Sequence, residues 1–474
     1  MGSIRHDTPV SNRSPRSVSR YNSGVPHAVW QRIGRAVALA ATLTSAACGP
    51  TWRPVPVDVI FVTWDSTRAD HLSAYGYPRP TTPALEAFAA DAVRFDTAIA
   101  QHNWTRPSYA SMLTSLHNWQ FPGLALGSAQ LTLPEILRAH GYRTHGLVQN
   151  PNLSATYHFD QGFDSYQEIN EGATPTHMTG LAIGTLEDLV DDERPFFMFV
   201  HYQGPHWPYQ ASPEFAGAFM RDDSVLVSSD EIAALMSTHG EGWDPEAPDA
   251  NARVRNIIDQ YDGDLRDTDA ALGSLLDWLE AHSAFRETLI VYNADHGDEF
   301  NDRGSFGHAH PNLHPELVHV PLIIRFPDAT GIPPRVVTAP VQNVDILPTI
   351  LATIGMEPPD GIAGRSLLPL DAIASTGRLA FSNLGRFVSV RTADRALLAD
   401  LNGTPRFSLY DIRRDPGERD PLEAPTRDPA FAPLESAVMA WLDAFEENRN
   451  RQPDQPAPVD DRLRQRLRSL GYVR

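Results

Sequence analysis

The stretch Val57-Asp58-Val59-Ile60-Phe61-Val62-Thr63 decides the fold of this chain. It is an almost continuous apolar run rich in β-branched residues, which is typical of a strand buried in a parallel sheet. The run leads directly into Trp64-Asp65-Ser66-Thr67-Arg68. Open α/β sheets bind their ligands at the carboxyl ends of their strands. The stretch therefore predicts a buried strand and places Asp65 at a candidate ligand site.

Two later apolar runs repeat this pattern. Residues 195–200 predict a strand that delivers His206 at its end, and residues 288–292 predict one that leads to Asp295 and His296. Helical spacing alternates with these strands, which predicts an α/β fold with a mostly parallel central sheet and helices on both faces. We expect a short strand over 144–149 and helices over 83–93, capped by Thr82, and over 133–140, 181–189, 254–282 and 344–354.

The C-terminal part has a different pattern. Short alternating runs at 388–391, 396–400 and 406–410 predict a small antiparallel sheet, and residues 434–445 predict a helix. Residues 212–249 are acidic and irregular, which favours a surface insertion or lid. We therefore divide the chain into a signal segment (1–48), a catalytic domain (57–372), a small C-terminal α+β subdomain (378–446) and a tail (447–474).

Composition limits the possible functions. The 474 residues, 42% hydrophobic and 21% charged, suit a globular protein with a sizeable core. The formal net charge of -20 argues against a nucleic-acid partner, which needs clustered cationic side chains. It leaves an anionic substrate open, because a bound cation can reverse the sign of the charge within one pocket. Cys48 is the only cysteine, which excludes an intramolecular disulfide and a cysteine-based zinc cluster.

The N-terminal segment has the features of an export signal. Several arginines precede the apolar run 36–43, and small residues then lead into Cys48. This order resembles a bacterial lipoprotein signal, in which Cys48 would become the lipidated first residue. The run is too short to span a bilayer. We therefore expect export to the periplasm or cell envelope, with membrane attachment only through a lipid anchor at Cys48.

A threonine precedes the next helix-forming stretch, His102-Asn103-Trp104-Thr105-Arg106-Pro107-Ser108. Proline and the small residues after it predict that Thr105 lies just before a helix N-terminus, where backbone N–H groups and the helix dipole favour a bound anion. Taken alone, the pattern also fits an ordinary threonine N-cap. The alternative is a nucleophile that attacks a phosphate or sulfate ester.

The predicted strand ends bring together two carboxylates and imidazoles. Asp65, Asp295 and His296 would share one edge of the sheet, with His206 beside them. Carboxylates suit Ca²⁺, Mg²⁺ or Mn²⁺, and an imidazole widens the choice to Zn²⁺. The residues therefore predict a site for a divalent cation.

Motifs along most of the chain resemble the sulfatase family of the alkaline phosphatase superfamily. They include Asp65-Ser66-Thr67-Arg68-Ala69-Asp70-His71-Leu72, Pro107-Ser108, Pro205-His206-Trp207-Pro208-Tyr209, Asp295-His296-Gly297, Gly307-His308-Ala309-His310, Val320-Pro321-Leu322, Gly364-Arg365-Ser366-Leu367 and Leu467-Arg468-Ser469-Leu470-Gly471-Tyr472-Val473. The resemblance implies an alkaline-phosphatase-like fold and hydrolysis of a small-molecule or glycan ester.

The resemblance also implies roles for single residues. Asp65, Asp295 and His296 would bind one divalent metal ion, which by resemblance is calcium. Thr105 would be the nucleophile, and His206 would bind the ester oxygens. His310 would protonate the leaving group, and Arg68 would be a supporting residue. For His201 and His308, packing or hydrogen bonding to another site residue is an equal alternative.

One position departs from the family. Sulfatases place Cys or Ser in the motif Cys/Ser-x-Pro-x-Arg and convert it to formylglycine, whereas this chain has Thr105-Arg106-Pro107-Ser108-Tyr109. Formylglycine chemistry is therefore not expected, and an unmodified Thr105 would form a covalent intermediate that water must cleave. Arg106 or Arg68 would have to replace the missing arginine.

Three functions remain open after this departure. The first is an ester hydrolase that acts through Thr105. The others are a phospho-group transferase on the same fold and a catalytically inactive binding protein. Part of a second metal site could come from His201, His308, His310 or Asp262.

Overall fold

The computed structural model describes residues 55–120, 126–127, 130–190, 192–221, 225–282, 285–451 and 461–469. The expected signal segment, residues 1–48 with Cys48, lies outside these ranges. Within these ranges, no helix combines the length and the apolar character that a membrane span requires.

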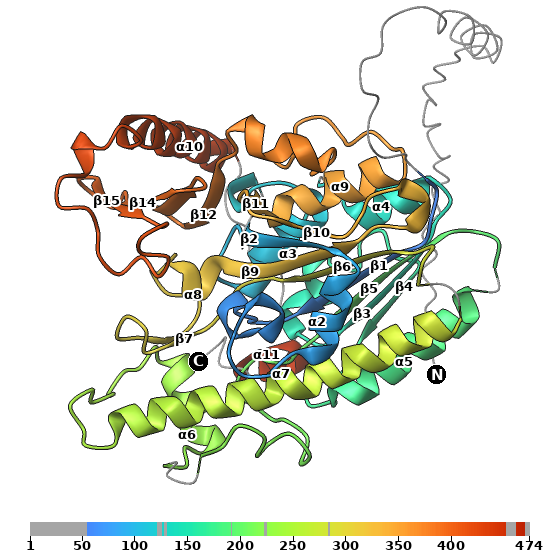
Figure 1. Cartoon of the computed structure of the whole chain (residues 1–474), viewed down its shortest axis with the longest axis horizontal. Coiled ribbons are helices and arrows are strands. Elements are labelled where there is room, and N and C mark those ends of the chain that lie inside the picture. Colours follow the sequence, from blue (N-terminus) through green and yellow to red (C-terminus); the bar gives the residue numbers. More distant parts are fainter. Residues whose placement is uncertain are drawn as a thin grey trace, which may run out of the picture. The chain divides into compact units, whose positions relative to one another are not determined.

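A nine-stranded sheet forms the centre of the described chain (Figure 1). Its strands are β1 (Val59–Trp64), β2 (Val93–Ile99), β3 (Arg143–Val148), β4 (Ser165–Glu168), β5 (Phe196–Tyr202), β6 (Leu289–Ala294), β9 (His319–Arg325), β10 (Arg335–Val337) and β11 (Val341–Gln342). The order is β10-β2-β9-β6-β1-β5-β3-β4, and β11 pairs with β2 outside this path. β9 runs antiparallel to β2 and β6, while β1 runs parallel to β5 and β6. The predicted mostly parallel α/β sheet is confirmed.

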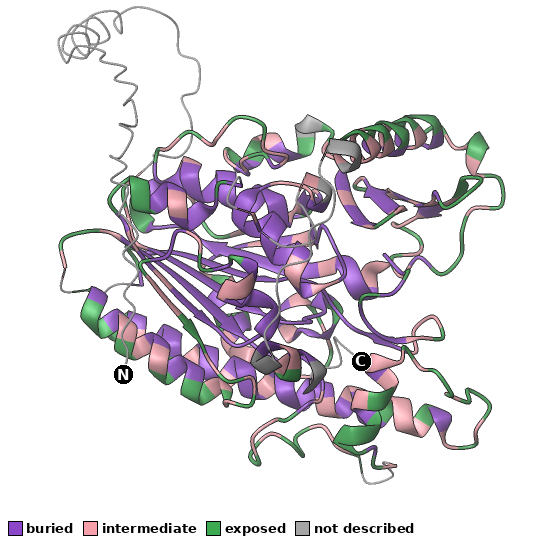
Figure 2. Ribbon diagram, turned by 180° about the vertical axis from the view of Figure 1, so that it is seen from behind, coloured by how far each residue is buried: buried purple, intermediate pink, exposed green. Residues whose placement is uncertain are grey.

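Helices cover both faces of the sheet. One face carries α2 (Pro83–Ala90), α5 (Pro175–Leu189) and α7 (Ala250–Ala281), and the other carries α3 (Thr105–Thr114), α4 (Leu133–Ala139) and α9 (Ile346–Thr353). Side chains alternate along β1, so Val59 and Phe61 pack with the second group of helices and Ile60 and Val62 with the first. Figure 2 shows the strands buried between the helices, of which α2, α5 and α7 keep an exposed side, whereas α3 and α9 have no exposed residue. This double cover explains why β1 is apolar at successive positions.

The helix expected over 83–93 is shorter than predicted. It ends at Ala90, and Val93 already begins β2. Thr82 makes no side-chain capping bond, because the carboxylate of Asp269 accepts the N–H groups of Ala84 and Leu85 at 2.9 and 2.8 Å. A helix N-terminus can thus be capped by a distant residue, which sequence spacing does not reveal.

The acidic segment 212–249 is more regular than predicted. It contains α6 (Ser229–Ser237), which starts with a capping box between Ser228 and Glu231. A hairpin of β7 (Glu299–Phe300) and β8 (Phe306–Gly307) lies beside it, since α6 contacts β8. The short helix α8 (Pro315–Val318) leads into β9.

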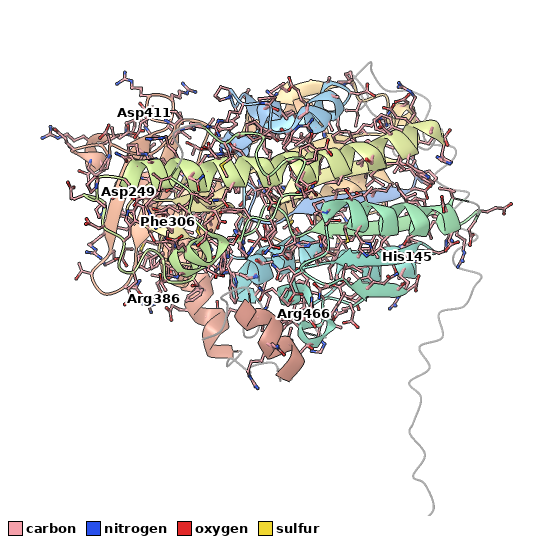
Figure 3. All side chains as sticks on the ribbon, turned by 90° about the horizontal axis from the view of Figure 1, so that it is seen from below. His145, Asp249, Phe306, Arg386, Asp411 and Arg466 are labelled. Atoms are coloured by element: carbon pink, nitrogen blue, oxygen red, sulfur yellow. The ribbon has the colours of Figure 1, made fainter. Side chains whose placement is uncertain are left out.

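The predicted small antiparallel sheet is confirmed near the C-terminus. Its strands are β12 (Ala380–Leu384), β13 (Phe387–Arg391), β14 (Arg395–Asp400) and β15 (Arg406–Asp411), of which β12 was not predicted. Apolar side chains of β13 to β15 pack against α10 (Phe431–Arg451). The last described element, α11 (Asp461–Ser469), carries Arg466, which Figure 3 labels. Leu463 and Leu467 of α11 are buried in the core on the α3 face of the central sheet.

Candidate active site

Three acidic and imidazole side chains meet at the carboxyl edge of the central sheet. Asp65 follows β1, and Asp295 and His296 follow the adjacent strand β6. Their ligand atoms lie within 4.8 Å of one another, and all three residues are completely buried. The structure thus brings together the three residues expected to bind a metal.

The two carboxylates are only partly hydrogen-bonded. Oδ1 of Asp295 accepts the N–H groups of Ser66 and His296 at 3.1 and 2.9 Å, whereas its Oδ2 has no hydrogen-bond partner. Asp65 accepts bonds from Ser66 Oγ at 3.1 Å and Asn150 Nδ2 at 2.5 Å. Burial, followed by the charge of Asp65, raises the pKa of Asp295 well above its ordinary value. Two buried carboxylates this close cannot both be ionised unless a positive charge lies beside them.

The orientation of His296 fits such a positive charge. Nδ1 of His296 lies 2.9 Å from the carbonyl oxygen of Gly297 and so carries the proton. Its Nε2 lone pair therefore faces Asp295 Oδ2 at 3.4 Å and Asp65 Oδ1 at 3.8 Å. Burial, followed by His308, lowers the pKa of His296 to about 3. A neutral imidazole and two carboxylates, all offering lone pairs to one point, suit a divalent cation.

Thr105 lies against this cluster. It is the first residue of α3, with Trp104 at the N-cap position, so the prediction that it precedes the helix is off by one residue. Its Oγ1 lies 3.3 Å from Nε2 of His296, and the residue is completely buried. The hydroxyl is therefore directed at the cluster, at the positive end of the α3 dipole.

Two further histidines complete the site. The ring of His308 lies 4.3 Å from that of His296 and 5.2 Å from that of His206. Nδ1 of His308 is 2.6 Å from Oδ1 of Asp298, a buried carboxyl that is not among the predicted site residues. His206 is held by its own Nδ1, which lies 2.6 Å from the carbonyl oxygen of Trp207.

His310 lies in a neighbouring cluster instead. Its Nε2 is 2.9 Å from Glu299 Oε2, and its ring is 5.1 Å from that of His239. The structure places His308 beside His206 and His296, and His310 two residues further along the same loop, paired with Glu299. The difference arises in the β7–β8 hairpin, which ends at Gly307 and so directs the very next residue, His308, into the site.

The arginines considered for anion binding are engaged elsewhere. Arg68 forms ion pairs with Asp70 at 2.9 Å and Asp302 at 2.7 Å and donates to the carbonyl of Asp298 at 3.1 Å. Arg106 donates to Asn152 and stacks 3.6 Å above the ring centroid of Tyr157. Arg68 therefore supports the loop that carries Asp298, and Arg106 contacts Asn152 and Tyr157.

Other residues surround the cluster without joining it. His201 Nε2 lies 3.4 Å from Asp65 Oδ2, and Asn150 bonds the same oxygen. These contacts come from strand ends, but nothing in their local sequence distinguishes them. Asp262 is bonded by Arg79, Tyr77 and His71 and does not approach the cluster. Within the described ranges, Asp65, Asp295 and His296 are the one group with metal-binding geometry.

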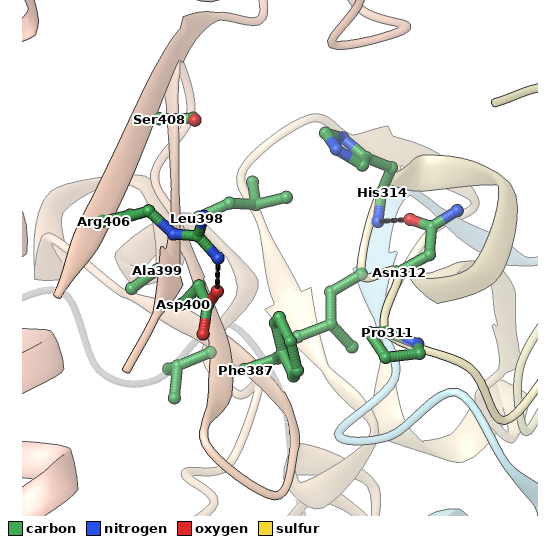
Figure 4. Close-up of a pocket in the computed structure, with 11 residues that line it drawn as sticks. Pro311, Asn312, His314, Phe387, Leu398, Ala399, Asp400, Arg406 and Ser408 are labelled. Carbon is green, nitrogen blue, oxygen red and sulfur yellow. Dashed lines mark hydrogen bonds and ion pairs between the residues drawn. The ribbon is translucent and has the colours of Figure 1, made fainter. Parts of the chain in front are cut away.

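Two cavities lie near these loops. One of about 180 Å³ opens beside His206 and is lined by polar residues including Gln149, Gln203 and Asp264. The other, of about 270 Å³, lies between the 311–314 loop and strands β13 to β15 (Figure 4). It is lined by Phe387 and by the ion pair of Asp400 with Arg406, and none of the metal-cluster residues reaches it.

Comparison with known proteins places this geometry in a family. The family model described as Sulfatase matches residues 57–356, and the model described as N-sulphoglucosamine sulphohydrolase, C-terminal, matches residues 308–444. An N-acetylglucosamine-6-O-sulfatase of Bacteroides thetaiotaomicron is 24% identical over an alignment of 524 residues. The alignment covers 88% of this chain and 92% of the relative.

Solved structures share the fold. One, determined in complex with its substrate D-glucosamine-2-N,6-O-disulfate, superposes with a TM-score of 0.63 at 22% identity and covers 84% of this chain and 99% of its own. The phosphonate monoester hydrolase of Silicibacter pomeroyi has the same TM-score and identity and covers 84% of this chain and 96% of its own. Both likenesses establish the architecture.

Proposed function

This chain belongs to the sulfatase family, and from that premise we propose that it hydrolyses sulfate or phosphate esters through Thr105 beside one divalent metal ion. The family supports ester hydrolysis in general. The observation that carries the mechanism is the position of the Thr105 hydroxyl, 3.3 Å from His296 at the start of α3.

Asp65, Asp295 and His296 would hold the metal ion. When bound, a divalent cation supplies positive charge that offsets the two carboxylates and favours the ionised hydroxyl of the nucleophile. Calcium is the metal we propose from the family, and magnesium, manganese or zinc would also suit these ligands.

The covalent step begins at the Thr105 hydroxyl. Its oxygen, after losing the proton to solvent, attacks the sulfur or phosphorus atom. A bond from Oγ1 to that atom forms as the bond to the leaving oxygen breaks, and the leaving alkoxide takes up a proton. Water then attacks the same atom, breaks its bond to Oγ1 and releases sulfate or phosphate, so Thr105 is restored.

The imidazoles at the mouth of the site would bind the ester. His206 and His308 lie close enough to each other to contact the oxygens of one tetrahedral group. His308 is oriented by Asp298, which fixes the ring nitrogen that faces the site. His310 would protonate the leaving group, as the resemblance implies; its Nε2 is held by Glu299, while its buried Nδ1 has no hydrogen-bond partner.

The similar proteins support two substrate classes. One is named for a 6-O-sulfated sugar, and another was solved with a sulfated glucosamine. A third is named for phosphonate monoesters. From these names we propose a glycan or small-molecule sulfate ester as the first substrate to test, and a phosphate or phosphonate ester as the second.

We also propose that the protein is exported and lipid-anchored at Cys48. The basis is the order of arginines, apolar run and small residues before that cysteine. Cell fractionation tests the anchor. If the wild-type protein is found in the membrane fraction and Cys48→Ser is found in the soluble fraction, the anchor is supported. If the variant stays in the membrane fraction, the anchor is contradicted.

The decisive experiment is a turnover assay of metal-loaded protein on aryl sulfate, phosphate and phosphonate esters. We expect hydrolysis of at least one ester and a loss of about 10³-fold or more in Thr105→Ala. Mass spectrometry of acid-quenched protein should find a sulfuryl or phosphoryl group on Thr105. A modified Thr105 that discharges to an added alcohol faster than to water would assign the transferase alternative. No turnover with any ester would contradict the proposal.

A further inference from the structure

The cavity beside His206 contains a polar side chain that lacks partners. Gln203 is only 8% exposed, yet neither its amide oxygen nor its amide nitrogen has a hydrogen-bond partner. Gln149, Gln210 and Trp207 line the same cavity. Buried amides are almost always hydrogen-bonded, so the orphaned side chain marks a place for a ligand that both donates and accepts hydrogen bonds.

The C-terminal helix α11 holds one wall of this cavity. Arg466 donates from Nε to Glu171 at 2.8 Å and from a terminal nitrogen to Glu168 at 3.2 Å. Its other terminal nitrogen donates to the carbonyls of Gln149 and Ile169 at 3.3 and 3.2 Å. Glu171 and Gln149 both line the cavity, so one guanidinium joins the two segments that form its wall.

Gln149 extends this connection toward His206. Its amide nitrogen donates to Ala173, another wall residue, at 2.9 Å. Its amide oxygen accepts the N–H of Gln203 at 2.9 Å. The carbonyl of Gln203 in turn accepts the N–H of His206 at 3.0 Å. The backbone around the orphaned amide is therefore fixed from α11 to the active site.

The charges of the wall are cancelled. The carboxylate of Glu171 is paired with Arg466, and both side chains are less than one-fifth exposed. Burial, followed by the charge of Asp267, raises the pKa of Asp264 to about 8, so this lining carboxyl is uncharged at neutral pH. In the described part of the chain, no arginine lines the cavity. Among the described residues, the lining therefore offers a polyanion no arginine as a counter-charge.

We propose that this cavity binds the alcohol half of the ester and selects an uncharged, hydroxyl-rich group such as a sugar ring, with Arg466 as the positioning residue of its wall. Hydroxyl groups satisfy both atoms of the Gln203 amide, and Trp207 offers an aromatic surface to the carbon face of a sugar. The assignment rests on the proposed ester hydrolysis for its biological meaning, but binding of the sugar can be measured without turnover.

The test uses the full chain and two probes, neutral N-acetylglucosamine and anionic glucuronate, in saturation-transfer NMR titrations. We expect the neutral probe to bind at least fivefold more tightly than glucuronate. Gln203→Leu should weaken binding of the neutral probe about tenfold, and Arg466→Met about fivefold, while Arg466→Lys restores part of the loss. The matched control is Arg335→Met, which breaks an Arg–Asp pair with Asp371 outside the cavity and should leave binding unchanged.

Kinetics separate positioning from a merely structural role. On a glycosyl ester, Arg466→Met should raise KM with little change in kcat, and the unfolding temperature should match that of the Arg335→Met control. Equal loss of kcat on every ester would overturn the positioning role. Binding of N-acetylglucosamine that Gln203→Leu does not weaken, or a preference for glucuronate, would overturn the pocket assignment. If Gln203-dependent binding occurs but no ester is cleaved, the proposed hydrolysis fails and the pocket assignment stands.

Discussion

Two buried acidic clusters in this molecule are neutralised in different ways. The strand-end cluster consists of Asp65, Asp295 and His296, and the α7 cluster consists of Asp262 with Arg79. Arg79 lies 2.7 Å from Asp262, and hydroxyl and imidazole groups bond the remaining lone pairs. Among the described residues, no arginine forms an ion pair with Asp65 or Asp295, and one oxygen of Asp295 has no hydrogen-bond partner.

The difference separates structural charge from functional charge. A buried carboxylate is tolerated when a cation and hydrogen bonds are supplied by the chain itself, as in the α7 cluster. Where the chain omits the cation, the cost of the buried charge remains until a proton or a metal ion is bound. The strand-end cluster lacks a cationic side chain of its own. This lack is a stronger indication of a bound ligand than the presence of acidic residues.

Asp295→Asn should produce the largest effect. It removes one carboxylate from the strand-end cluster, and we expect kcat/KM for the best ester to fall about 10³-fold or more, because several kcal/mol of charge stabilisation are lost. Steady-state kinetics at saturating metal measure the loss. Asp262→Asn is the matched control in the α7 cluster and should retain kcat per folded molecule. Full activity in Asp295→Asn would show that the two clusters do not differ in function.

Asp262→Asn should instead affect stability. It leaves Arg79 with a weakened counter-charge, and we expect the free energy of unfolding to fall by about 3 kcal/mol. Urea unfolding with and without metal measures it, and the loss should be equal in both conditions. A loss that appears only with metal would place Asp262 in the metal site.

Chelation should destabilise the wild-type protein through the strand-end cluster. At a free metal concentration 100 times the Kd, bound metal contributes about 2.7 kcal/mol to the free energy of unfolding. Thermal unfolding with and without a chelator measures this contribution. Asp295→Asn should lose most of the metal response, whereas Asp262→Asn should keep it. Identical curves for wild type with and without metal would contradict the assignment.

Asp264, also on α7, tests a third form of neutralisation, by a proton. Its pKa of about 8 is raised above that of the unfolded chain, so its contribution to stability is complete below about pH 4 and is lost as the pH rises to about 8. Between these pH values the free energy of unfolding should fall by about 1.4 kcal/mol for each pH unit. Asp264→Asn should remove this slope, as measured by urea unfolding across that range. A variant with the wild-type slope would show that another group is responsible.

Sequence patterns predicted strands β1, β5 and β6 better than β2. The apolar runs of β1, β5 and β6 were located because strands buried on both faces leave no polar positions. β2, an inner strand between β10 and β9, was not predicted, because Arg94 and Asp96 alternate with its buried Val93 and Phe95 and the helix before it ends at Ala90. Helix caps can also depend on distant contacts, as Asp269 shows at the start of α2.

The residues of the candidate site were also predicted only in part. Asp65, Asp295 and His296 could be brought together because carboxyl ends of neighbouring parallel strands share one edge. His308 could not be distinguished from His310, because the hairpin before them sets which ring enters the site. Gly307 at its end has φ +76°, and a Cβ there would lie 2.9 Å from the carbonyl of Met236. That contact depends on α6, which the sequence did not predict.

The position of β1 between β5 and β6 also determines when the site forms during synthesis. Val59 pairs with Phe197 and Leu289, so most of the chain must leave the ribosome before β1 has both neighbours. The chain loses entropy when such long loops close, before the strand contacts that offset this loss have formed. Folding that depends on such contacts is therefore slow. The cation ligands therefore assemble late, and metal should slow unfolding of the finished sheet without accelerating folding. Availability of metal would then determine how long an active molecule lasts and not how fast it appears.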